Sequence, residues 1–460
     1  MACTRNRSRI SVEAILAAAV ALTLALPSGA WAAFASQFSF SVGEQYNDNI
    51  FFEKKKEHDF VTVITPALHL YYAPTGQGAP TANLNISPTG LLYARHSDLN
   101  DFGFTDTSAV TGGYTYFYSP RLTFNFSESF QRQGDTRLAS PFNGFQTPLT
   151  PTSPPPVGTP IPQDPSQNLK DFISQGGQLT NNFSFQGNFL YRPDVSFAGG
   201  YSNIFTKFLR VGGSDWSQDF FVRGIYNWKQ EHNLHVGYRV TQNNSRNGDN
   251  GMIHNFDFGD DYFTSRVYQL QLTPTLSLAA STGLSINTSD SGPRVANNTS
   301  LTVTKLWETA SFAAGLRKGL TPSFGIAGIS DTTTFFANFN IQLAERISAN
   351  AGFDYSLYDT DNVNFKTMQV SMGLQYLITT WLSSSLSSSF RSIDSGAGAN
   401  STGLLKRGTV DGTSVFLNFT VSFDLWPNQG LTRSLSAQAL SPVLRTPFPT
   451  VGSAPGQSQP

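Results

Sequence analysis

The chain has 460 residues, of which 13% are charged and 39% hydrophobic, and its formal net charge is −1. A balance this close to neutral does not favour a nucleic-acid partner, and a single cysteine excludes a disulfide framework and a thiolate metal site. The six histidines are scattered, with no His-x-x-x-His pair and no phosphate-cradling glycine motif beside them. We therefore expect no cofactor and no metal ion.

The first 33 residues have the features of a secretory signal peptide. Arg5, Arg7 and Arg9 precede a short apolar run over 10–26, and Ala30-Trp31-Ala32 supplies a small-x-small cleavage pattern. Cleavage there would leave a mature chain without cysteine. No later stretch is long and apolar enough to cross a bilayer as a helix. The sequence thus predicts an exported protein whose membrane-crossing elements, if any, are strands.

A two-residue period runs through much of the mature chain. In 415–425 the odd positions carry Val, Leu, Phe, Val, Phe and Leu, and the even positions carry Phe, Asn, Thr, Ser and Asp. The same alternation occurs in 276–287, 335–343, 347–357 and 368–378. Because successive side chains of a strand point to opposite faces, each segment has one apolar and one polar face. Segments of about ten residues with this pattern are typical of a transmembrane β-barrel.

The pattern predicts an all-β fold, an antiparallel up-and-down barrel over residues 34–426 with eighteen strands, sixteen being the nearest alternative. Short turns such as 119–121, 192–194 and 344–346 alternate with longer loops, as they do at the periplasmic and outer ends of such barrels. The expected strands are 36–46, 59–72, 81–95, 105–118, 121–133, 170–191, 194–208, 216–228, 233–243, 261–272, 275–287, 298–307, 309–318, 331–343, 346–358, 364–377, 381–393 and 411–425.

Several loops are polar and rich in Gly, Asn and Asp, and we expect 243–260, 290–298 and 394–412 at the outer end. The loop over 134–168 contains nine prolines, which cannot join a strand ladder. It would either fold inward and narrow a pore or remain a surface loop. Residues 427–460 lack the alternation and predict a flexible periplasmic tail.

The polar positions of the strands are the candidate functional residues, because they would line the lumen. They are rich in Ser, Asn, Gln and Gly with few charges, and such neutral walls suit water and sugar-like solutes, although they could merely solvate the interior. Three charges, Glu44, Glu128 and Lys305, fall on the expected lipid face, and a bulge, an interfacial depth or a slipped register could account for them. The pore-lining candidates are Arg223, His235, Arg239, Asn338, Asn340, Gln342, Asp354, Gln369, Gln375, Arg391, Asn418 and Asp424.

The start of the mature chain carries a family resemblance. Residues 38–51 end in Tyr46-Asn47-Asp48-Asn49-Ile50-Phe51, and 59–68 read Asp-Phe, a hydrophobic run and Thr-Pro. These two segments resemble the first strands of the β-barrel porin 2 family of Gram-negative outer-membrane proteins. The resemblance implies a location in the outer membrane and, by analogy with some members, a connection with exopolysaccharide export. It supplies no catalytic residue.

The leading hypothesis is a non-enzymatic, porin-like channel for passive diffusion or export of small polar solutes or glycans. The expected partners are outer-membrane lipid, lipopolysaccharide, the barrel-insertion machinery and, through the resemblance, polysaccharide export components. One alternative is a structural or surface-interaction barrel with a plugged lumen. A second is a barrel-wall hydrolase with a Ser-His-Asn arrangement, for which the many Ser and Asn residues single out no particular triad. His69 and His235 should both face the lumen, where a histidine is more often a hydrogen-bonded wall residue than a catalyst.

Overall fold

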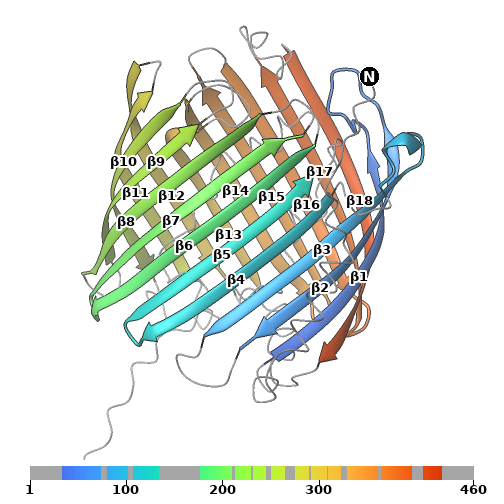
Figure 1. Cartoon of the computed structure of the whole chain (residues 1–460), viewed down its shortest axis with the longest axis horizontal. Coiled ribbons are helices and arrows are strands. Elements are labelled where there is room, and N and C mark those ends of the chain that lie inside the picture. Colours follow the sequence, from blue (N-terminus) through green and yellow to red (C-terminus); the bar gives the residue numbers. More distant parts are fainter. Residues whose placement is uncertain are drawn as a thin grey trace, which may run out of the picture.

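The computed structural model describes residues 34–73, 80–101, 107–133, 177–209, 213–228, 232–244, 250–264, 275–289, 292–307, 309–322, 329–360, 364–395 and 408–426. These residues form one antiparallel sheet of eighteen strands (Figure 1). The strands are β1 (Phe34–Asn47), β2 (Asp59–Tyr72), β3 (Thr81–Tyr93), β4 (Thr107–Ser119), β5 (Leu122–Gln133), β6 (Gln178–Arg192), β7 (Val195–Phe208), β8 (Ser214–Asn227), β9 (His232–Asn244), β10 (Gly251–Thr264), β11 (Thr275–Ser289), β12 (Gly292–Leu306), β13 (Ala310–Pro322), β14 (Ile329–Ala344), β15 (Ile347–Asp359), β16 (Asn364–Leu377), β17 (Leu382–Ser395) and β18 (Gly408–Trp426).

The sheet closes on itself because every strand pairs with its neighbours in sequence and β1 also pairs with β18. Gly43 lies opposite Asn418 and Ser39 opposite Ser422 at this seam, where the blue and red strands of Figure 1 meet. Closure leaves no edge strand with unpaired backbone groups, which is the condition for strands to cross a bilayer. The fold is thus a closed, all-β barrel with the eighteen strands that the alternation predicted.

The two ends of the barrel differ in their connections. Two-residue turns at 120–121, 193–194 and 345–346 each join an even-numbered strand to the next odd-numbered one. They lie at the end where β1 begins and β18 finishes. The described segments 48–58 and 94–101, which follow β1 and β3, lie at the other end, which we call the loop rim. The short 3-10 helix η2 (Ser97–Leu99) belongs to this rim, and no described helix is long and apolar enough to span a membrane.

The tenth strand corrects the sequence analysis. We expected a strand over 261–272 and an outer loop over 243–260, but β10 covers Gly251–Thr264. The Asn, Asp and Gly residues suggested a loop, yet Phe256 and Phe258 alternate with Asp257 and fit a strand with one apolar face. Two further loops are also shorter than expected, because β12 begins at Gly292 and β18 at Gly408. Residues 170–176 of the expected strand 170–191, the proline-rich segment 134–168 and the expected tail 427–460 lie outside the described residues.

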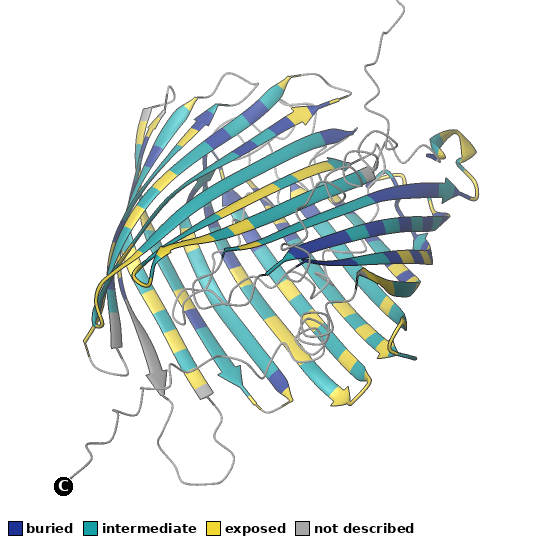
Figure 2. Cartoon of the chain, turned by 60° about the horizontal axis from the view of Figure 1, so that its bottom comes forward, coloured by how far each residue is buried: buried dark blue, intermediate teal, exposed yellow. Residues whose placement is uncertain are grey.

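The register divides the side chains between two faces, since residues directly opposite in a ladder share a face. Exposed large apolar side chains gather on one of them, for example Phe220 (48% exposed), Val236 (63%) and Phe258 (60%) on three adjacent strands. We call this the apolar face. Figure 2 shows the resulting alternation of more and less exposed residues along the strands. The other face carries the polar positions and is described below.

The three charges on the apolar face keep their places in the structure. Glu44 and Lys305 lie near strand ends, and Lys305 Nζ sits 4.9 Å from the centre of the Trp307 ring. Glu128 is exposed near the middle of β5, opposite Gly112, and the register is unbroken there. Glu44 and Lys305 thus lie towards the ends of their strands, whereas Glu128 is a charge at mid-strand on the apolar face.

Candidate functional site

The strand pairing places all twelve candidate residues on one face of the sheet. Arg223 lies opposite Gly237, which lies opposite Asp257, and the same row-by-row pairing continues through every strand to β18 and β1. The candidates on this face are Arg223 on β8, His235 and Arg239 on β9, Asn338, Asn340 and Gln342 on β14, Asp354 on β15, Gln369 and Gln375 on β16, Arg391 on β17, and Asn418 and Asp424 on β18.

A contact that skips one strand identifies this face as the inner, concave one. Arg223 Nη2 on β8 lies 3.1 Å from Asp257 Oδ2 on β10, across Gly237 of β9. Side chains two strands apart converge on the concave side of a curved sheet and diverge on the convex side. A Cβ at Gly237 would lie 2.9 Å from Asp257 Cγ, so only a residue without a side chain lets the carboxylate cross the strand. We call this polar face the inner face.

Charged residues gather on the inner face of β8, β9 and β10. His235 Nε2 lies 3.5 Å from Asp257 Oδ2, next to the Arg223–Asp257 pair. Four residues beyond His235 on β9, Arg239 Nε lies 3.4 Å from Asp219 Oδ2. The side chains of Arg223 and Arg239 are 30% and 41% exposed, so both guanidinium groups reach towards the lumen. We call these four residues with His235 the β8–β10 station.

The guanidinium of Arg239 contacts an aromatic ring as well as the Asp219 carboxylate. Its Cζ lies 5.7 Å from the centre of the Phe221 ring, which is within reach of a cation–π contact. The ring of Phe221 lies flat against the wall, because its Cε1 is 2.6 Å from the place a Cβ would take at Gly200. Thr241 Oγ1 donates to Asp219 Oδ1 at 2.7 Å, so the carboxylate is held in turn. The station is therefore built from neighbouring side chains that fix one another.

A second Arg–Phe contact lies further round the wall. Arg317 Cζ lies 4.7 Å from the centre of the Phe336 ring, and its charge acts on Asp354. Asp354 is opposite Gln369, which is opposite Arg391, so three of the candidates form one row over β15–β17. The charges of this sector lie on β13, β15 and β17.

Three of the neutral candidates make local hydrogen bonds. Asn340 Nδ2 donates to Ser311 Oγ at 3.4 Å, Gln342 Nε2 to the Glu345 carbonyl at 3.5 Å, and Asn418 Nδ2 to Thr420 Oγ1 at 3.1 Å. Asp424 accepts from Gln37 Nε2 at 3.2 Å. Hydroxyl pairs join other strands of the same face, as in Ser127–Ser184 at 2.6 Å, Ser281–Ser300 at 2.6 Å and Ser389–Ser414 at 2.8 Å. The inner face is thus a polar surface with few charges.

Sequence reasoning missed several charged members of the inner face, among them Asp219, Asp257 and Arg317. Asp257 was assigned to a loop, although its flanking Phe residues could have placed it on a strand. Around Asp219 and Arg317 the alternation of apolar and polar residues is less clear than around Asp257. The pairing of Asp219 with Arg239 follows only from the register between β8 and β9. Within the described part of the chain, no three His, Asp or Glu side chains are grouped so as to hold a metal ion.

The hydrolase alternative has a possible counterpart in neighbouring residues of β1, β2 and β3. Ser39 Oγ lies 3.4 Å from His69 Nε2, and Asn85 is opposite His69 in the ladder. However, Ser39 is 9% exposed and His69 is 4% exposed. A nucleophile must reach its substrate, so this buried contact does not favour catalysis.

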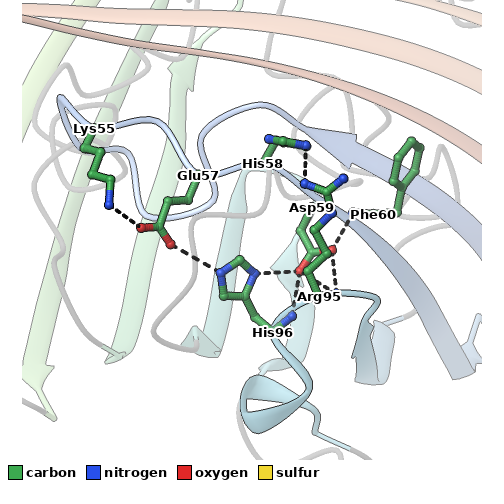
Figure 3. A network of polar contacts seen from close by, with 7 residues as sticks. All are labelled: Lys55, Glu57, His58, Asp59, Phe60, Arg95 and His96. Carbon is green, nitrogen blue, oxygen red and sulfur yellow. Dashed lines mark hydrogen bonds and ion pairs between the residues drawn. The ribbon is translucent and has the colours of Figure 1, made fainter.

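At the loop rim, two loops are tied together by a polar network (Figure 3). His96 lies between two carboxylates, with Nδ1 2.8 Å from Asp59 Oδ2 and Nε2 3.3 Å from Glu57 Oε2. The backbone amide of Arg95 donates to Asp59 Oδ1 at 3.0 Å, and the Arg95 guanidinium contacts the His58 ring. The hydrogen bond that the protonated His96 ring donates to Asp59 is the main reason that the pKa of His96 is raised above its usual value.

The first loop is also fastened across the seam of the barrel. Lys56 Nζ lies 3.2 Å from Asp48 and 3.0 Å from Asp411 of β18, while Asn49 Nδ2 donates to the Asp411 carbonyl at 2.8 Å. Below it, Val61, Val63, Leu91, Tyr93 and Phe416 form a buried apolar cluster on the inner face, against which Leu99 packs. This sector of the inner wall is therefore covered, unlike the β8–β10 station.

Comparison with known proteins gives solved structures of related shape only. No protein-family model matches the chain. A search of curated proteins likewise finds no match. Among solved structures, OccK2 (OpdF) of Pseudomonas aeruginosa is 8% identical, with 86% of this chain and 98% of that chain covered and a TM-score of 0.46. OpdQ of the same organism is 11% identical (85% and 99% covered, TM-score 0.44), and OccAB3 of Acinetobacter baumannii is 9% identical (85% and 99%, 0.43). At these values the family and the solute must be argued from the chain itself, and the resemblance to the β-barrel porin 2 family stays a prediction.

Proposed function

We propose that this protein is an outer-membrane channel through which small polar solutes diffuse. The observation that carries the proposal is a closed barrel of eighteen strands with an apolar face outside and a polar face inside. An apolar exterior is stable only against acyl chains, and barrels of sixteen to eighteen strands have room for water inside. Passage through such a lumen requires a suitable width and lining and no chemical step.

Two features of the chain support the proposed location: its first residues and the end of the barrel at which the strands begin and finish. Residues 1–33 carry the signal-peptide pattern, and the barrel begins and finishes at the short-turn end. We place that end in the periplasm of a Gram-negative bacterium and the loop rim at the cell surface. Lipid and lipopolysaccharide would contact the apolar face, and the insertion machinery would assemble it. Export of glycans, with exopolysaccharide components as partners, is the more specific form of the proposal and rests on the family resemblance.

Reconstitution of the purified mature chain in planar lipid bilayers tests the channel. We expect steady, stepwise currents in potassium chloride and uptake of small sugars in a vesicle swelling assay. The matched control is the same preparation after heat denaturation, which should give no steps. A correctly folded barrel that stays silent in both assays would contradict the proposal.

A barrel with a plugged lumen is the second candidate, and one observation favours it. Leu99 of the loop rim packs against an apolar cluster in which Val61 is 0% exposed, so part of the inner wall is already closed. Deleting the proline-rich segment 134–168 separates the two ideas. A current that appears only after the deletion would support a plug, whereas an unchanged current would mean that this segment does not constrict the lumen.

A further inference from the structure

The β8–β10 station offers donors and acceptors side by side on the inner wall. Arg223 and Arg239 supply N–H groups, while Asp219 and Asp257 supply carboxylate oxygens, and the formal charges of these four residues cancel. Arg223 uses Nη2 for Asp257, and Arg239 uses Nε for Asp219, so each guanidinium retains further N–H groups for another acceptor. Their exposure towards the lumen makes those groups reachable.

The alternation of charge decides which solute fits. A small anion that approaches either arginine meets an aspartate beside it, and a small cation near either aspartate meets an arginine. A neutral solute with two adjacent hydroxyl groups is repelled neither by the aspartates nor by the arginines. Each hydroxyl can accept a hydrogen bond from a guanidinium and donate one to a carboxylate. The surroundings are polar too, since Asn255 lies opposite Arg239 on the next strand.

The station is also prepared before any solute arrives. Phe221 lies under the Arg239 guanidinium, and Thr241 holds Asp219 from the neighbouring strand. Gly237 lets Asp257 cross β9 to reach Arg223, with His235 beside the same carboxylate. Side chains that are fixed in advance lose little conformational freedom on binding, so weak contacts with a passing solute are not cancelled by the cost of ordering the wall.

We propose that Arg223, Arg239, Asp219 and Asp257 form a docking station for neutral polyhydroxylated solutes, of the sugar or sugar-alcohol class, on one side of the lumen. This inference rests on the proposed channel function and specifies its substrate class. Phe221 and His235 are positioning residues, because they act through the arginine and aspartate that they contact.

Block of single-channel current by three solutes of similar size tests the station. The probes are sorbitol, which is neutral, gluconate, which is an anion, and glucosamine, which is a cation. For the wild-type barrel we expect half-block by sorbitol at a concentration at least fivefold below that of either charged probe. A lower half-block concentration for gluconate or glucosamine would overturn the station as a site for neutral solutes.

A charge-conserving pair of substitutions separates direct hydrogen bonding from the field of the wall. Arg223→Gln with Asp257→Asn replaces one charged donor and one charged acceptor by neutral amides without altering net charge. Because neutral hydrogen bonds are weaker than charge-assisted ones, it should raise the sorbitol half-block concentration about tenfold while the potassium-to-chloride permeability ratio stays the same. The matched control is Lys318→Gln with Asp331→Asn, an ion pair of 3.7 Å on the apolar face of β13 and β14, which should leave both values unchanged. Heat-modifiable gel mobility verifies that both variants fold.

The two proposals fail in distinguishable ways. An open channel whose sorbitol block is equal in the wild type and the Arg223→Gln, Asp257→Asn variant overturns the station and leaves the channel intact. A folded wild-type barrel with no current overturns both, because the station needs an accessible lumen.

Discussion

Arg223 and Asp257 form an ion pair of 3.1 Å although a whole strand separates them. The contact depends on Gly237, the residue between them, because any side chain there would enter the space of the Asp257 carboxylate. The same row continues into Gly283 of β11. A relationship of this kind occurs only on the concave side of a closed sheet, and it links the shape of the barrel to the arrangement of charge on its wall.

Gly237→Ala should separate this pair. The new methyl group would displace Asp257 from Arg223, and crowding of a packed site of this kind costs about 1–3 kcal/mol of unfolding free energy. The measurement is the urea midpoint of the barrel in lipid vesicles. Gly224→Ala is the control, since a Cβ at Gly224 meets the Phe197 ring at an ordinary 3.6 Å. Equal midpoints for the two variants would mean that the carboxylate does not occupy that space.

The tie between the two rim loops should strengthen in acid. The pKa of His96 is raised mainly by its hydrogen bond to Asp59, so its protonated form stabilises the folded loops. That contribution is fully present below the ordinary histidine value near 6.5 and is lost as pH rises through the raised pKa. Amide hydrogen exchange over 94–101, corrected for intrinsic rates, should therefore be slower at pH 5.5 than at pH 8.5.

His96→Gln should remove this pH dependence, because glutamine does not titrate. His254→Gln is a suitable control, since His254 contacts Tyr238 on the apolar face of β9 and β10, away from the rim network. A pH dependence that survives in the His96 variant and disappears in the His254 variant would refute the assignment.

Replacing Glu128 by an apolar residue should stabilise the barrel against unfolding. Glu128 is exposed near the middle of β5 on the apolar face, where acidic groups cost less than the roughly 2–4 kcal/mol of a basic group at the bilayer midplane. Glu128→Leu should therefore raise the unfolding free energy of the monomer in vesicles by about 1–2 kcal/mol. Lys305→Leu, at the strand end beside Trp307, should change it by less than about 1 kcal/mol. A destabilised Glu128→Leu barrel would instead show that the carboxylate has a partner.

Features of the fold that depend on local sequence could be predicted, whereas features that depend on the register between strands could not. The number of strands was predictable from local information, because the two-residue alternation marks each strand. The same alternation assigns the polar positions, such as Asn338 and Asn340 on β14, to the inner face. The bounds of β10 were wrong because Asn, Asp and Gly are common both in loops and on a polar wall. The partners of Arg223 and Arg239 were out of reach, since they depend on the register between strands and on a glycine that lets a side chain cross one.

The central claim is that neighbouring residues of one strand face water and lipid in turn, around a lumen that solute can enter. Gln369 and Val370 of β16 test it directly, because they point to the inner and apolar faces, and the mature chain is expected to contain no other cysteine. Each is replaced by cysteine, and a charged, membrane-impermeant thiol reagent is added while single-channel current is recorded. We predict that the reagent lowers the current of Gln369→Cys and leaves that of Val370→Cys unchanged. A reaction at Val370→Cys with none at Gln369→Cys would contradict the account.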